Sequence, residues 1–175
     1  MASKGFKAGP AGIGAAAAVL AAAALAALAP VPVLEVARED SGRLLWRLPV
    51  RNGSRVRLHY VNSLYHAPTT EEFVVREGAL RLVEVTTTAE AVMEYLRIDP
   101  PYRMVHGRLA AATSGPTVPA LVTRIGQTGR QWLEVGDRLL PLYRVGVGEA
   151  VRIRVVRRPW AVAQLGPFAE RPETP

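Results

Sequence analysis

Apolar and polar residues alternate along most of the chain, in short segments separated by turns. The clearest segment is 55–62, in which Val56, Leu58 and Tyr60 share one side and Arg57 lies on the other. Because successive side chains of a strand point to opposite faces, a period of two predicts a strand with one buried face.

Seven further segments alternate in a similar way and are predicted as strands: 43–48, 73–76, 79–86, 121–125, 131–135, 138–143 and 151–155. Turn residues separate them, and Asn52-Gly53 and Glu77-Gly78 have the composition of tight hairpin turns. Turns at this spacing predict an all-β fold, either a small antiparallel sandwich or a partly open barrel.

One short helix is predicted among the strands. Thr87 is followed three residues later by Glu90, which resembles a capping box. The helix would run to about Leu96 and end before Asp99-Pro100-Pro101, because the residue before a proline disfavours the helical conformation. The stretch 101–119 shows no regular pattern and is predicted to be irregular.

The N-terminal region follows a different pattern. Residues 11–34 are uncharged and mostly Ala, and Lys4 and Lys7, the only lysines of the chain, precede them. A basic stretch before an uncharged apolar run is typical of an export signal or an N-terminal membrane anchor. Since lysines stay on the cytoplasmic side, we expect the chain from Glu35 onward to be extracytoplasmic.

The same run bears on whether the segment is cleaved. Ala27-Leu28-Ala29 has the small-x-small pattern of a signal peptidase site, but Pro30 follows it, with a fixed φ and no N–H. We therefore expect the N-terminal segment to be retained as an anchor in the cell membrane rather than cleaved. The predicted organisation is an anchor or signal over 1–34, a β-domain over 35–165 and a flexible tail over 166–175.

Charge and cysteine content exclude several classes of function. The chain has 22 Lys and Arg against 15 Asp and Glu, and no Cys, which excludes disulfides and thiolate metal sites. The densest basic group is Arg152, Arg154, Arg157 and Arg158. It is interpreted as a solvated strand face or, alternatively, as a contact for anionic lipid head groups. Nucleic-acid binding needs a clustered basic face with interleaved aromatics, so we expect none.

The three tryptophans receive two interpretations. Trp46 and Trp132 stand in alternating segments with apolar neighbours and are predicted to pack in the core or at a sheet edge. Trp160 follows the last predicted strand. It either anchors at a membrane interface or covers the edge of the sheet.

The densest run of polar side chains lies between two predicted strands, at 60–73. It supplies the candidate binding residues Tyr60, Asn62, Ser63, His66 and Glu71. Loops held by rigid strands often carry binding groups, so the run predicts a shallow polar patch for a partner protein or a small solute. The structural alternative is that Asn62 and Ser63 bond the local backbone and close a turn.

Catalysis and metal binding are weaker interpretations of this run. Ser63, His66 and Glu71 or Glu72 have the residue types of a hydrolytic triad, but no nucleophile elbow surrounds the serine. His59 and His66 lack the helical spacing of a common metal motif. We therefore expect a non-enzymatic protein with no catalytic residue, no metal and no cofactor.

The run also resembles the bacterial domain-of-unknown-function 1850 family. That family's pattern is Tyr-x-His-Ser-Val-Glu, then x-x-Pro-Val, then Glu and an aromatic residue. Five positions agree without gaps, at Tyr60, Ser63, Pro68, Glu71 and Phe73, with Leu64 in place of Val. Asn62 replaces the family's His, Tyr65 replaces its Glu, and the usual Gly-Leu-Pro segment is missing.

The resemblance covers most of residues 33–158 and implies a small exported or anchored protein. Such proteins are often encoded beside tripartite ATP-independent (TRAP) transporters of the TAXI type. The resemblance therefore implies an accessory role in solute uptake, with a membrane transporter subunit as the partner.

Overall fold

Two antiparallel sheets contain most of the chain in the computed structural model, which describes residues 10–128 and 130–164, with side chains from residue 18 onward. The first sheet has the order β2-β1-β12-β9, formed by β1 (Pro30–Arg38), β2 (Leu44–Pro49), β9 (Ala120–Arg124) and β12 (Ala150–Pro159). In the second, the order is β11-β10-β3-β4-β5-β7-β6, and β8 pairs with β5.

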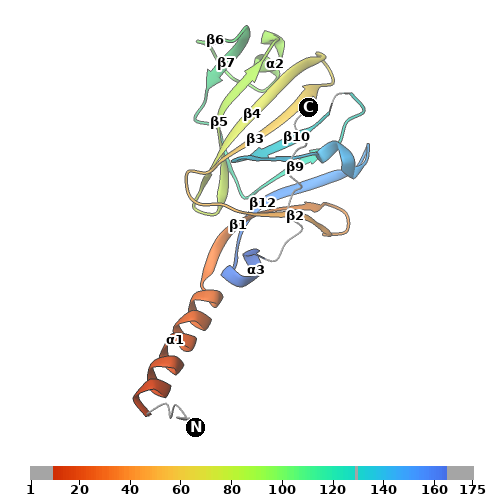
Figure 1. Cartoon of the computed structure of the whole chain (residues 1–175). Coiled ribbons are helices and arrows are strands. Elements are labelled where there is room, and N and C mark those ends of the chain that lie inside the picture. The colour runs from red at the N-terminus through yellow and green to blue at the C-terminus, as the bar shows by residue number, and fades with distance from the viewer. Residues whose placement is uncertain (1–9, 129, 165–175) are drawn as a thin grey trace, which may run out of the picture.

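The strands of the second sheet are β3 (Arg55–Asn62), β4 (Ala67–Arg76), β5 (Ala79–Thr87), β6 (Arg103–Val105), β7 (Arg108–Ala112), β8 (Thr117–Val118), β10 (Trp132–Val135) and β11 (Arg138–Leu140). Helix α1 (Pro10–Leu28) projects from one end of the molecule, and α2 (Glu90–Tyr95) lies at the opposite end (Figure 1). A 3-10 turn, Leu142–Val145, precedes β12, and α3 (Trp160–Gln164) follows it.

Both sheets contribute side chains to one hydrophobic core, which confirms the predicted all-β sandwich. Its buried residues include Leu34, Val36, Val56, Leu58, Phe73, Val75, Leu133, Val151 and Ile153. The predicted alternation of β3 is confirmed, since Val56 and Leu58 are buried and Tyr60 packs against the core. Each fully buried aliphatic side chain contributes about 1.5–3 kcal/mol to stability, so this core is the main source of the fold's stability.

The predicted helix is confirmed as α2, but its predicted cap is wrong. Ala89 is the N-cap residue and makes no side-chain cap bond, whereas Thr87 is the last residue of β5 and is fully buried. Helix α2 is held instead by packing, because its own residues Val92 and Met93 are fully buried. Tertiary contacts replace the local capping signal.

The stretch 101–119 is not irregular, contrary to prediction. It forms a β6–β7 hairpin and the short strand β8. His106 and Gly107 make the hairpin turn, with φ of 48° and 74°. The strands are three and five residues long and β7 contains three alanines, so neither shows a clear alternation.

The Asn52-Gly53 turn is real, but it does not connect paired strands. It leads from β2 in one sheet to β3 in the other. Gly53 has φ of 87°, and its N–H donates to the carbonyl of Val75 at 2.9 Å. By contrast, the Glu77-Gly78 turn joins β4 and β5 as the predicted hairpin.

The structure divides the apolar run 11–34 between two elements. Helix α1 ends at Leu28 and β1 begins at Pro30, so Val33 and Leu34 are fully buried in the sandwich. An uncharged run fits a helix and a buried strand equally well, and periodicity alone does not separate them. The N-terminal lysines and the predicted tail 166–175 lie outside the described residues.

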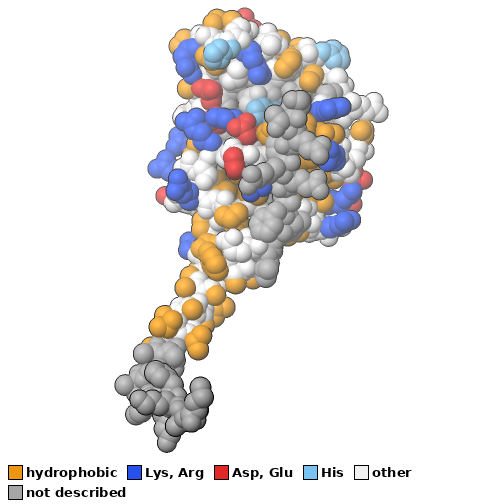
Figure 2. All heavy atoms as spheres, in the orientation of Figure 1, with side chains coloured by type: hydrophobic (Ala, Val, Ile, Leu, Met, Phe, Trp, Pro, Cys, Tyr) orange, Lys and Arg blue, Asp and Glu red, His pale blue; other side chains and the backbone are white. Residues whose placement is uncertain are grey.

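Hydrophobic side chains cover the described part of α1 (Figure 2). Val19, Leu20, Leu25 and Leu28 are between 66% and 72% exposed. Within the described residues, no helix has the combination of length and hydropathy needed to cross a membrane.

Candidate functional site

The β3–β4 hairpin separates the five predicted site residues into three places. Tyr60 and Glu71 lie on the face turned toward the core, Asn62 ends β3, and Ser63 and His66 are exposed in the turn. The structure therefore brings together only two of the five side chains.

Asn62 closes the turn between β3 and β4. Its side chain is buried, and its Oδ1 accepts hydrogen bonds from the N–H groups of Leu64 at 3.0 Å and Tyr65 at 3.1 Å. This is the local backbone bonding that favours Asn in turns. In the described part of the chain, no hydrogen bond joins Ser63 to His66, whose φ is 51°.

Tyr60 and Glu71 form a hydrogen-bonded pair. The Tyr60 hydroxyl donates to Oε1 of Glu71 at 2.6 Å. Burial raises the pKa of Glu71, and the bond from Tyr60 opposes this rise in part. Burial also raises the pKa of Tyr60, and the nearby carboxylate of Glu71 adds to that effect. Both pKa shifts are in the direction of the neutral side chain.

Two further tyrosines border this pair. The rings of Tyr65, in the turn, and Tyr95, at the end of α2, meet edge to face with centroids 6.4 Å apart. Tyr95 acts electrostatically on Tyr60 and contributes to its raised pKa. Tyr65 is 39% exposed and Tyr95 61% exposed. We call these four residues, Tyr60, Tyr65, Glu71 and Tyr95, the tyrosine–glutamate site.

The tyrosine–glutamate site lies at the end of the molecule opposite α1, because α2 is there (Figure 1). Local sequence reasoning misses Tyr95, which is 24 positions beyond Glu71 in the printed sequence. Only the packing of α2 against the end of β5 brings it to the β3–β4 turn.

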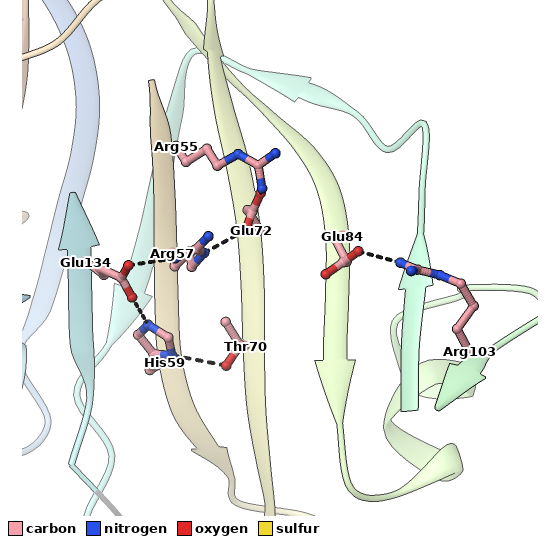
Figure 3. A network of polar contacts seen from close by, with 8 residues as sticks. All are labelled: Arg55, Arg57, His59, Thr70, Glu72, Glu84, Arg103 and Glu134. Carbon is pink, nitrogen blue, oxygen red and sulfur yellow. Dashed lines mark hydrogen bonds and ion pairs between the residues drawn. The ribbon is translucent and has the colours of Figure 1, made fainter. Parts of the chain in front are cut away.

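The opposite face of the same strands carries a network of ion pairs (Figure 3). Glu72 accepts bonds from Arg55 and Arg57 at 2.6 Å each, and Arg57 also reaches Glu134 at 2.6 Å. His59 bridges Glu134 and Thr70, at 3.0 Å from each. Glu72 therefore neutralises Arg55 and Arg57 across the strands, whereas Glu71 faces the other way.

The histidines and glutamates of this region lie apart in the structure. His59 and Glu72 belong to the outer network, Glu71 faces inward and His66 is on the turn. Among the described residues, no group of three or more His, Asp or Glu side chains is placed to hold a metal ion.

A second charge cluster lies on the first sheet around Glu35. This carboxylate is 3% exposed and accepts bonds from Arg47, Arg158 and Arg154, at 2.9, 2.9 and 3.5 Å at the closest. Burial by itself would raise the pKa of Glu35, but the bonds from Arg158 and Arg47 outweigh it and lower the pKa. Part of the predicted basic group therefore has a structural role, and Arg152 likewise pairs with Glu39.

Comparison of the chain with protein-family models, with curated proteins and with solved structures finds no match. The resemblance to the domain-of-unknown-function 1850 family stays a prediction.

Proposed function

We propose that the protein is a membrane-anchored, extracytoplasmic β-domain that acts as a non-enzymatic binding protein. Helix α1 is its anchor, and the tyrosine–glutamate site, at the opposite end, is its contact surface. The accessory role beside a TRAP-type transporter follows from the family resemblance. The apolar surface of α1 at one end of the molecule and the exposed tyrosines at the other support this orientation.

The exposed surface of α1 supports the anchor. Its described side chains are apolar and stand free of the sandwich. Apolar surface left in water costs about 25 cal/mol per Å² relative to an apolar environment, and lipid removes this cost.

The observation that carries the proposal is the kind of residue that lies next to the C-terminal end of α1. The N–H of Trp160 donates to the carbonyl of Ala29 at 2.9 Å, so Trp160 lies where α1 ends and is 50% exposed. Arg157, which is exposed, pairs with Pro32 of β1 and donates to the carbonyl of Pro30 at 3.0 Å. Tryptophan and arginine next to an apolar helix are typical of the membrane interface, where each Arg gains about 1 kcal/mol from anionic lipid.

The distal end supports a protein contact. Leu64, Tyr65 and Tyr95 expose 64%, 39% and 61% of their surface there. Tyrosine is enriched among the residues that dominate binding energy at protein interfaces. Catalysis by Ser63 and His66 would need the two side chains to be hydrogen-bonded neighbours. Without that bond, binding is the function that the geometry supports better.

Cell fractionation tests the anchor. We expect the full-length protein in the membrane fraction, with its C-terminal region cleaved by protease added outside intact cells or spheroplasts. Recovery in the soluble cytosolic fraction, protected from that protease, would overturn the proposal.

Cross-linking followed by purification in mild detergent tests the contact surface. The tagged protein should recover a transporter subunit, and a Tyr65→Ala/Tyr95→Ala variant should lose it. A Val122→Ala/Val147→Ala variant is the matched control, because these residues are 48% and 60% exposed elsewhere. Equal recovery by both variants, or no transporter subunit with the unmodified protein, would contradict the assigned contact.

A further inference from the structure

The guanidinium group of Arg157 lies at the level of the first residue of β1. Its Nη2 donates to the carbonyl of Pro30 at 3.0 Å, and α1 ends two residues before Pro30, at Leu28. The side chain is exposed, and within the described residues it forms no ion pair. A guanidinium group has five N–H donors, so the bond to Pro30 leaves others for a ligand. Arg157 can therefore bind an anion beside the end of α1 without breaking an ion pair.

The cluster around Glu35 adds further positive charge next to Arg157. Glu35 is bonded by three arginines, so the four side chains together carry an excess of two positive charges. These arginines are Arg47, Arg154 and Arg158. In the outer network of the second sheet, by contrast, arginines and glutamates pair in equal numbers. A charge excess on one part of a surface attracts anions to that part, and Arg158 directly follows Arg157 in β12.

The position beside α1 indicates which anion would bind. Trp160 lies at the same level, because its N–H donates to the carbonyl of Ala29, and Arg47 connects α3 to the charge cluster by donating to the carbonyl of Val162 at 3.2 Å. The headgroup layer of a bilayer begins where the hydrocarbon ends and is about 5–8 Å thick on each side. A bilayer entered by α1 therefore brings lipid phosphates to Arg157, and arginine binds phosphate oxygens by parallel N–H bonds.

From these features we propose that the protein recognises anionic phospholipids, with Arg157 bound to the lipid phosphate and the charge excess around Glu35 selecting against zwitterionic headgroups. Phosphatidylcholine carries the same phosphate as phosphatidylglycerol, but its choline group is a cation that the arginines repel. This inference rests on the proposed anchor and adds a lipid specificity to it.

Quenching of tryptophan fluorescence by brominated lipid tests the specificity. The full-length protein is inserted into phosphatidylcholine bilayers that contain increasing amounts of brominated phosphatidylglycerol or brominated phosphatidylcholine. The mole fraction that gives half of the maximal quenching should be at least about threefold lower for phosphatidylglycerol. Trp160→Phe should remove most of the quenching, because Trp46 and Trp132 belong to strands of the two sheets.

The same titration separates the specificity from the anchor. Equal quenching by the two lipids overturns the specificity and leaves the anchor in place. If neither lipid quenches the fluorescence, Trp160 does not meet a membrane, and the anchor and the specificity are both wrong.

Two variants test the assignment to Arg157. Arg157→Gln removes an exposed charge and should abolish the difference between the two lipids. Arg97→Gln removes an equal charge from an exposed side chain just beyond α2, at the opposite end of the molecule, and should keep the difference (Figure 1). Loss of the difference in both variants would show an effect of net charge alone, and its retention in Arg157→Gln would show that Arg157 is not the contact. Either result overturns the assignment.

Soluble glycerol phosphate separates a lipid headgroup from a free phosphate. Added at the concentration of the brominated lipid, it should leave the preference for phosphatidylglycerol unchanged, because the acyl chains hold the lipid phosphate beside α1. Loss of the preference would assign the site to a soluble anion and overturn the lipid specificity.

Discussion

Glu35 accepts hydrogen bonds from three arginines, whereas Glu71 has Tyr60 as its one partner among the described residues. Burial acts on both carboxylates in the same direction, toward the protonated form. The arginines reverse this for Glu35, and its pKa falls, while the pKa of Glu71 rises. The contributions of the two residues to the free energy of unfolding therefore change with pH in opposite directions.

Replacing Glu71 by Gln should stabilise the protein at neutral pH. Since the pKa of Glu71 is higher in the folded protein than its ordinary value of 4.5, the favourable protonated state is complete below pH 4.5 and is lost as pH rises through the folded pKa. The free energy of unfolding of Glu71→Gln should therefore exceed that of the unmodified protein at pH 7 and match it at pH 4. Urea unfolding at both pH values measures the difference, and an equal gap at both would contradict this account.

Replacing Glu35 by Gln should have the opposite effect. The change removes the buried carboxylate that Arg47, Arg154 and Arg158 share, and should cost about 3 kcal/mol at pH 7. Because the folded pKa of Glu35 is lowered, its contribution is present above pH 4.5 and disappears as pH falls further. Glu149→Gln is the control, since the pair with Arg38 is 37% exposed at the carboxylate and should cost less than about 1 kcal/mol.

At the scale of elements, the positions of most strands can be predicted from the local alternation of apolar and polar residues, but the pairing of the strands cannot. Segment 55–62 was predicted with the bounds of β3, and the Glu77-Gly78 turn with its hairpin. Asn52-Gly53 has the same kind of turn signal, yet it connects strands of different sheets. A turn fixes the local direction of the chain, whereas the choice of neighbouring strand depends on which faces bury most apolar surface.

Gly53 provides the test at this scale. Its φ of 87° is strained for any residue with a Cβ, although no atom lies within 4 Å of the position such a Cβ would take. Gly53→Ala should therefore destabilise the protein by about 1–2 kcal/mol through backbone strain alone. Gly126 has an ordinary φ and one neighbouring atom, at 3.9 Å, so Gly126→Ala should change the unfolding midpoint little. Equal effects of the two variants would show that the turn conformation is not required.

At the scale of the whole molecule, the start of the β-domain differs from the predicted boundary at residue 35. β1 begins at Pro30 and pairs with β12 over its whole length, and with β2 from Val33 onward. The central position of β1 in its sheet makes residues 30–34 part of the fold rather than part of a linker.

Two truncated chains distinguish these boundaries. A chain beginning at Pro30 should fold and remain soluble, because it keeps β1 and removes the exposed surface of α1. A chain beginning at Glu35 lacks Val33 and Leu34, both fully buried, and should lose about 3–6 kcal/mol from those two side chains alone. Circular dichroism and thermal unfolding measure the outcome, and equal stability of the two chains would refute the observed boundary.

Periodicity and composition within about ten residues are enough to predict the all-β class, most strand positions, α2 and the apolar N-terminal segment. The sequence also predicts Tyr60 and Glu71 as candidate binding residues, which stays a prediction. Tertiary structure decided that Asn62 closes a turn, that residues 30–34 join the sandwich and that Tyr95 meets Tyr65. These features depend on which distant segments share a core, and burial energy, unlike local conformational preference, is a property of the folded chain as a whole.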